Sequence, residues 1–126
     1  AGHPGHGRVY LRLSIHVAET DAQADAESEA SIMRGYGALK SQLEGSPNAR
    51  RRAQLDDVLS LTFESAKREK VVIGSPDRVT ARLAELKAEL GIDGILAELN
   101  FGAQIAPDAM MRSCQLLCET VRPRLQ

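Results

Sequence analysis

Aromatic residues are scarce in this sequence, and tryptophan is absent. Tyrosine and phenylalanine together make up 3% of the chain. An aromatic surface for stacking nucleic-acid bases is therefore not expected. An excess of positive charge is also missing, because 16 Lys and Arg residues stand against 17 Asp and Glu residues. General nucleic-acid binding depends on clustered positive charge, so we expect no nucleic-acid partner.

Cysteine is scarce in this sequence, and long apolar runs are absent. The two cysteines, Cys114 and Cys118, lie four residues apart in a helical pattern. This spacing gives neither a disulfide framework nor a CxxC redox motif, and two buried free thiols suit a reducing cytoplasm. No apolar run approaches the roughly 20 residues of a membrane helix, and no secretory signal is recognisable. We therefore expect a cytoplasmic protein without a membrane partner.

What is present is the composition of a soluble globular domain. Hydrophobic residues make up 43% and charged residues 26% of the 126 residues, which is ordinary for a single folded domain. Residues 1–7 are rich in glycine and predict a flexible N-terminal tail. His3 and His6 in this tail lack a third ligand, so no metal site is expected. Residues 8–126 are predicted to form the domain, with an irregular insert at 44–70.

Strand and helix patterns alternate along the domain. Such alternation indicates a parallel sheet with crossover helices. We expect the helices on one side of the sheet and the short middle strand between the two longer ones. The period-2 runs predict strands at 9–17, 71–73 and 95–99, and helical periodicity with its end signals predicts helices at 21–43, 76–90 and 107–121, which Pro123 ends.

Two of the predicted strands have a polar face. On the first strand, Arg12, Ser14 and His16 occupy alternate positions and therefore share one face. On the last strand, Glu98 and Asn100 do the same. Polar side chains in a protein interior are costly unless they are paired or bind a ligand. These five residues are therefore the best candidates for a functional site.

Five short motifs resemble the bacterial luciferase-like flavin monooxygenases, and they occur in that family's order. The likeness covers nearly the whole chain after Gly7, although Ala103 replaces the second glycine of the family's "NFGG". The motifs are VAETDAQA at 17–24, similar to "VAETDxEA"; VVIGSPDRV at 71–79, similar to "VxGxPExV"; LGIDGIL at 90–96; LNFG at 99–102; and MRS with VRPR at 111–113 and 121–124, similar to "MRSxxLFxExVxPRF".

The resemblance implies a fold and an activity. The family folds as a TIM (β/α)8 barrel of about 250 residues, so this α/β chain is expected to be the C-terminal part, strands six to eight. The family implies a monooxygenase that oxidises a small organic substrate with dioxygen and reduced FMN from a separate flavin reductase. Some relatives use the deazaflavin F420 instead. A homo-oligomer is expected, and the isolated chain is expected to be inactive.

The resemblance also implies roles for individual residues. In the alkanesulfonate branch, the matching strand carries an Arg-x-His pair near substrate and flavin, at the positions of Arg12 and Ser14. His16, one step further along the same face, is a candidate for the missing imidazole. The expected catalytic residues are His16 and Arg12. The expected cofactor-binding residues are Arg12, Ser14, Ser75 and Asn100, and no metal ligand is expected.

Each assignment has a structural alternative. Arg12 and Glu98 would also suit a buried ion pair across the barrel. His16 would also suit a hydrogen-bonded interior histidine. Ser75 has the position of an ordinary helix N-cap, and the basic run Arg50–Arg52, a candidate for contact with a flavin phosphate or a reductase, would also suit a solvated surface. For the whole chain, the alternative is a non-catalytic module that self-associates or complements the missing barrel half.

Overall fold

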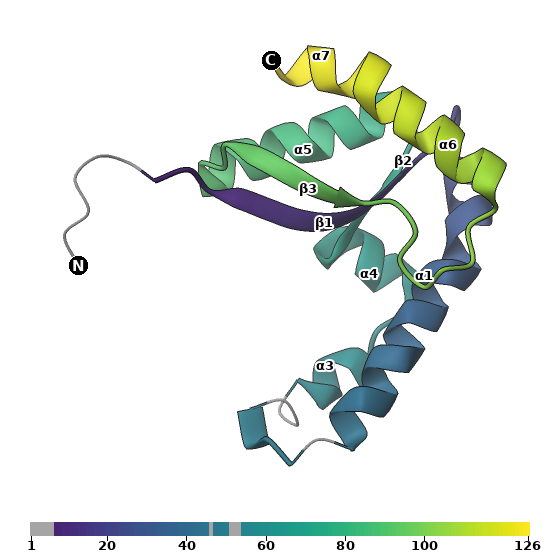
Figure 1. Cartoon of the computed structure of the whole chain (residues 1–126), viewed down its shortest axis with the longest axis vertical. Helices are drawn as coiled ribbons and strands as arrows, with labels where there is room; N and C mark the ends of the chain where they lie inside the picture. Colours follow the sequence, from purple (N-terminus) through teal and green to yellow (C-terminus); the bar gives the residue numbers. More distant parts are fainter. Residues whose placement is uncertain (1–6, 46, 51–53) are drawn as a thin grey trace.

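The fold is built around a three-stranded parallel sheet (Figure 1). The computed structural model describes residues 7–45, 47–50 and 54–126, so most of the predicted tail, with His3 and His6, lies outside the described residues. The strands are β1 (Tyr10–Val17), β2 (Val71–Gly74) and β3 (Gly94–Glu98), all parallel. The predicted strands and their parallel pairing are therefore confirmed, with ends shifted by about one residue.

The order of the strands is β2-β1-β3. The expectation that the short strand lies in the middle was therefore wrong. The long strand β1 has room for two partners, because β3 pairs with residues 10–14 and β2 with residues 14–17. Parallel crossovers are right-handed, so a chain that moves one way from β1 to β2 and back past β1 to β3 must place its two crossovers on opposite faces.

Helices accordingly cover both faces of the sheet, not one face as expected (Figure 1). The crossover from β1 to β2 contains α1 (Asp21–Glu44), α3 (Leu55–Leu59) and α4 (Phe63–Glu69). The crossover from β2 to β3 is α5 (Pro76–Leu90), which lies on the other face together with the C-terminal helix. Part of the predicted irregular insert is thus helical in the described residues.

Local signals fix where these helices begin and end. The hydroxyls of Thr20, Thr62 and Ser75 each accept a hydrogen bond from a backbone N–H in the first turn of α1, α4 and α5. Such N-caps satisfy donors that the helix itself leaves unpaired. At the other end of α5, Gly91 has the left-handed φ of 60° that favours glycine. The predicted starts of α1 and α5 are confirmed.

The C-terminal helix continues past the predicted stop at Pro123. It consists of α6 (Pro107–Leu116), a π-helical turn η1 (Leu117–Val121) and α7 (Arg122–Leu125). Proline lacks an N–H and its ring clashes with the carbonyl four residues earlier. A π turn widens the helix, and the Arg122 N–H bonds to the Leu117 carbonyl five residues back. The wider turn just before Pro123 makes room for the proline ring. The helix therefore continues past Pro123 with a local change in its hydrogen bonding.

The sheet separates two apolar cores. Ile15 and Val17 of β1 lie on the face that packs against α5 and η1, as their alternation predicted. The other face packs against α1 and α4 around β2. No helix of the described residues is long and apolar enough to cross a membrane. The first core contains Ile15, Val17, Val72, Val79, Leu83 and Val121, and the second contains Ala18, Ala24, Ile32, Phe63, Ala66, Val71 and Ile73.

Candidate functional site

The predicted polar face lies on the central strand, opposite the face that carries Ile15 and Val17. Arg12, Ser14 and His16 alternate with these apolar residues along β1, so their side chains lie on one face of the sheet. The β1–β3 register places Glu98 directly beside Ser14. The first and last strands are therefore neighbours, and their polar residues meet without a strand between them.

The amino-terminal half of the polar face is open to solvent. Arg12 Nη2 donates to Glu98 Oε2 at 3.0 Å, and the two side chains are 74% and 34% exposed. Leu96, which is in register with Arg12, is 60% exposed. The ion pair predicted as one alternative is thus formed, but the expectation that it is buried was wrong. The cause is the position of β3 at the sheet edge, where this face carries little cover.

The carboxyl-terminal half of the same face is closed. His16 is 1% exposed, and its Nε2 lies 3.1 Å from Oε1 of Glu27 in α1. The other oxygen of Glu27 accepts a hydrogen bond from Nη2 of Arg112 in α6. We call His16, Glu27 and Arg112 the His16 cluster. The interpretation of His16 as a hydrogen-bonded interior histidine is confirmed.

The electrostatics of the His16 cluster favour a charged Glu27. Burial alone would raise the pKa of the Glu27 carboxyl. The hydrogen bonds from Arg112 and His16 outweigh burial, so the pKa lies below its ordinary value. The bond to Glu27 in turn raises the pKa of Arg112. Within the described part of the chain, His16 Nδ1 and Arg112 Nε are buried without a hydrogen-bond partner.

A neighbouring serine holds the C-terminal helix in the position that forms this cluster. Ser113 is fully buried, and its Oγ accepts a hydrogen bond of 2.9 Å from the backbone N–H of Val17. Val17 is the last residue of β1, so this bond ties α6 to the carboxyl end of the central strand. Arg112, the preceding residue, is thereby brought to Glu27.

Ser75 and Asn100 have structural partners. The Ser75 hydroxyl caps α5 by accepting from the Arg78 N–H at 3.4 Å, and its own N–H donates to Asp21 Oδ1 at 2.7 Å. The bond from Ser75 lowers the pKa of Asp21. Asn100 Oδ1 accepts from the Ile105 N–H at 3.0 Å and closes the loop after β3. The capping alternative for Ser75 is confirmed, and cofactor binding by these two residues stays a prediction.

The same loop is fastened to α1. Ser31 Oγ donates to the Phe101 carbonyl at 2.6 Å and accepts from the Gln104 N–H at 3.0 Å. The Phe101 ring meets the Tyr36 ring edge-on, with centroids 5.0 Å apart. Ala103 has a φ of 60°, a conformation that favours glycine. Alanine therefore occupies a backbone position that suits glycine better.

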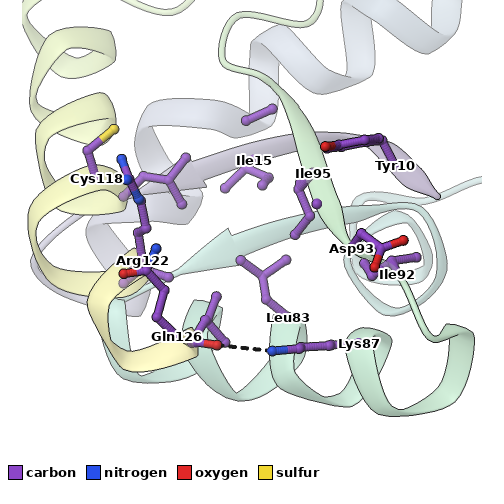
Figure 2. A pocket seen from close by; sticks show the side chains of 15 residues that line it. Tyr10, Ile15, Leu83, Lys87, Ile92, Asp93, Ile95, Cys118, Arg122 and Gln126 are labelled. Atoms are coloured by element: carbon purple, nitrogen blue, oxygen red, sulfur yellow. Dashed lines mark hydrogen bonds between the residues drawn. The ribbon is translucent and has the colours of Figure 1, made fainter. Parts of the chain in front are cut away.

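A cavity of about 540 Å³ lies on the opposite face of the sheet, beside β3 (Figure 2). Apolar side chains of Ile15, Leu83 and Ile95 gather at its centre, while Tyr10 and Asp93 lie at one end. No local pattern in the sequence indicates this cavity. The walls comprise Tyr10, Ile15, Leu83, Lys87, Ile92, Asp93, Gly94, Ile95, Ala97, Leu117, Cys118, Val121, Arg122, Leu125 and Gln126.

The two free cysteines lie along the C-terminal helix. Cys118 is exposed and Cys114 is half-buried, so the expectation of two buried thiols was wrong. Cys114 lies in α6 and Cys118 in the π turn η1. Among the described residues, no group of three or more His, Cys, Asp or Glu side chains is arranged to hold a metal ion.

Glu27, Arg112 and Ser113 are the site residues that sequence reasoning did not single out as such. Glu27 stands among several acidic residues of an Ala- and Glu-rich helix, and no pattern distinguishes it. Arg112 and Ser113 belong to the motif MRS, which by itself gives no sign of a contact with Glu27 or Val17. Arg112 and Ser113 lie 85 and 96 residues from their partners Glu27 and Val17, so only the fold links them to the site.

No family model and no curated protein matches this sequence. Solved structures do resemble it. One is the oxygenating constituent of 3,6-diketocamphane monooxygenase from Pseudomonas putida, a type II Baeyer–Villiger monooxygenase in complex with FMN, with a TM-score of 0.69 and 21% identity over 93% of this chain and 33% of that chain. Another is the monooxygenase RslO1 from Streptomyces bottropensis, with a TM-score of 0.63 and 21% identity over 98% and 33%.

A third similar structure is apo-MsnO8, with a TM-score of 0.54 and 25% identity over 89% of this chain and 34% of that chain. The chain therefore spans about a third of the length of each structure that it resembles. Its three parallel strands and their helices form a small α/β fold that is consistent with part of a TIM-barrel-like fold. The order β2-β1-β3, with helices on both faces, departs from a barrel, in which successive strands are neighbours and the helices lie outside. The predicted likeness to luciferase-like flavin-dependent monooxygenases is thus confirmed in the fold.

Proposed function

We propose that the chain is part of an FMN-dependent, luciferase-like monooxygenase that oxidises a small organic substrate with dioxygen and reduced flavin. The observation that supports it most is the fold likeness, over 93% of this chain, to a monooxygenase in complex with FMN. The five sequence motifs, which occur in the same order as in the luciferase-like monooxygenases, also support the proposal. Because the chain spans about a third of that enzyme, the activity is proposed for a complete barrel, which includes strands beyond these three.

The open half of the polar face has groups that suit a flavin. Arg12 is 74% exposed and uses one guanidinium nitrogen for Glu98, so further N–H donors remain for a phosphate or a ring carbonyl. The hydroxyl of the half-buried Ser14 lies on the same face. When bound, the flavin would supply the electrons that activate dioxygen. The chain would bind and orient it through Arg12, Ser14, Ser75 and Asn100.

The barrel position and the partners are proposals of the same kind. We infer strands six to eight of a (β/α)8 barrel, a flavin reductase as the source of reduced FMN, and a homo-oligomeric, cytoplasmic enzyme. An F420-dependent oxidoreductase is the alternative within the family. A comparison of FMN and F420 in the same binding titration distinguishes these two cofactors.

The proposal is tested by the natural polypeptide. An antibody against this chain should detect, in the source cells, a polypeptide about three times as long, as the coverage of 33% implies. That polypeptide should bind FMN in a fluorescence titration and consume oxygen with reduced FMN. The isolated chain should bind FMN weakly, because most barrel contacts are missing and binding must offset several kcal/mol of lost freedom. A longer polypeptide that fails to bind either flavin contradicts the proposal.

A second candidate function is a separate docking module, and the cavity beside β3 favours it. β3 is an edge strand, so one row of its backbone groups is unpaired within the described chain, and such edges accept another strand. The apolar cavity opens beside this edge. The occupant that suits both is the remaining part of a flavin-monooxygenase barrel on another polypeptide. A natural polypeptide of 13.7 kDa that purifies with a larger flavin-binding chain supports this function, and self-association alone contradicts it.

A further inference from the structure

The cavity of about 540 Å³ beside β3 lies on the face of the sheet opposite the polar face (Figure 2). Ile15 of β1 and Leu83 of α5 are buried in its walls and belong to the packed core. Ile95 of β3, Leu117 of η1 and Leu125 of α7 are half-buried, and each lines the cavity. The volume and the apolar walls are those of small-molecule sites, which typically occupy about 300–1,000 Å³.

Polar groups lie at two ends of this cavity. Arg122 and Cys118 lie on the C-terminal helix, and Tyr10 and Asp93 lie at the opposite end (Figure 2). Asp93 is already engaged, because its Oδ2 accepts a hydrogen bond of 2.7 Å from the Val9 N–H. An anionic ligand would therefore place its charge at the Arg122 end, away from the Asp93 carboxylate.

Arg122 is the cation of the cavity that has no ionic partner. Lys87, which also lines the cavity, donates to the Leu125 carbonyl at 3.2 Å. Arg124, two residues further along α7, pairs with Asp77 at 2.6 Å and does not line the cavity. Within the described part of the chain, Arg122 forms no ion pair, so its guanidinium has N–H donors left for a carboxylate.

We propose that this cavity binds an organic carboxylate with an apolar chain, whose carboxylate pairs with Arg122 and whose chain lies against Ile95 and Leu117. The apolar chain gains by leaving water against these side chains. The pair between the guanidinium and the carboxylate fixes the direction in which the ligand binds. The inference does not rest on the proposed function, because the cavity lies on the face opposite the one proposed for flavin.

Another polypeptide, as in the docking function above, is the other occupant that this cavity admits. The walls come from β1, β3, α5 and the C-terminal helix, so the chain itself surrounds the cavity on several sides. A small molecule can fill such a cavity, whereas a second polypeptide would mainly cover its rim and the edge of β3. The charge at one end and the apolar walls therefore favour a small amphipathic anion.

The ligand class is tested by calorimetric titration of the 126-residue chain with decanoate and, as the uncharged counterpart, decanol. Decanoate should bind at least about tenfold more tightly, since a hydrogen bond to a charged group contributes that much. Arg122→Met should abolish this difference, and Arg124→Met, the matched control, should retain it. Equal affinities for decanoate and decanol in the unmodified chain, or no binding of either, overturn the proposal even if Arg122→Met does not fold.

The place of binding is tested by alkylation of Cys118 with iodoacetamide in a Cys114→Ser chain. Cys118 is exposed, lines the cavity and lies four residues before Arg122 on the helix. At a decanoate concentration of about ten times its Kd, about a tenth of the cavities stay empty, so alkylation should slow about tenfold. Alkylation of Cys114, which does not line the cavity, should be unaffected in a Cys118→Ser chain. A Cys118 that decanoate does not protect overturns the proposal, also where a copurifying polypeptide protects it.

Discussion

Replacing Gly102 by alanine should strongly destabilise the chain. Gly102 has a φ of 88°, and a Cβ there would lie 1.7 Å from the Ser31 carbonyl oxygen. The left-handed conformation costs a non-glycine residue about 1–2 kcal/mol. Displacing Ser31 would also weaken its hydrogen bonds to the Phe101 carbonyl and the Gln104 N–H, at about 0.5–1.5 kcal/mol each. The expected loss in free energy of unfolding is therefore about 2–5 kcal/mol.

The matched control is a glycine of α1. Gly37→Ala meets nothing within 4 Å, so the higher helix propensity of alanine should stabilise the chain by up to about 1 kcal/mol. Urea unfolding followed by circular dichroism measures both variants. With a slope of about 1–3 kcal/mol per molar urea, Gly102→Ala should lower the midpoint by about 1 M or more. A midpoint equal to that of the unmodified chain would refute the reasoning.

Three further predictions concern charged residues. Arg12→Met and Glu98→Gln should each change the free energy of unfolding by less than about 1 kcal/mol in urea unfolding, because the pair is exposed; a double-mutant coupling above about 2 kcal/mol would contradict this. The hydrogen bond from the Ser75 backbone N–H lowers the pKa of Asp21 below its ordinary value of 3.8. The charged Asp21 carboxylate therefore stabilises the fold above pH 3.8, and this stabilisation is lost as the pH falls through the lowered pKa. Asp21→Asn should therefore lower stability at pH 7 and flatten its fall below about pH 4 in acid titration, whereas a slope equal to that of the unmodified chain counts against the argument. The Lys67 side chain is 7% exposed, and its Nζ lies 2.9 Å from Asp25 Oδ2. Lys67→Met should therefore lower the free energy of unfolding by about 1–3 kcal/mol, because it leaves the Asp25 carboxylate without this partner. An unchanged Tm in thermal unfolding would show that the ion pair does not stabilise the fold.

The elements could be predicted because their signals are local. Alternation in β1 and the caps at Thr20 and Ser75 depend on residues close in sequence. The strand order depends instead on which face each crossover takes, and no local pattern encodes that. The same holds for Pro123, whose effect depends on whether the preceding turn widens. Local sequence patterns therefore predicted the individual strands and helices, whereas their order in the sheet was known only from the structure.

The candidate site divides in the same way. The alternation of Arg12, Ser14 and His16 predicted a shared polar face, but their surroundings differ along it. His16 is closed in by α1 and α6, which bring Glu27 and Arg112 from distant parts of the sequence. Gly35 gives a similar lesson. Glycine is unfavourable inside a helix, yet a Cβ at Gly35 would lie 2.3 Å from the Phe101 ring, so the glycine makes room for the loop after β3.

The two halves of the polar face support one conclusion about the chain. Contacts within the chain explain the buried half, because His16 is held by Glu27 and Glu27 by Arg112. They do not explain the open half, where Leu96 is 60% exposed beside the exposed Arg12. An apolar side chain and a cation side by side on a sheet face suit a ligand or partner with both apolar and anionic groups. FMN has a flat ring system and a phosphate, so the open half of the face offers groups that suit part of the proposed cofactor.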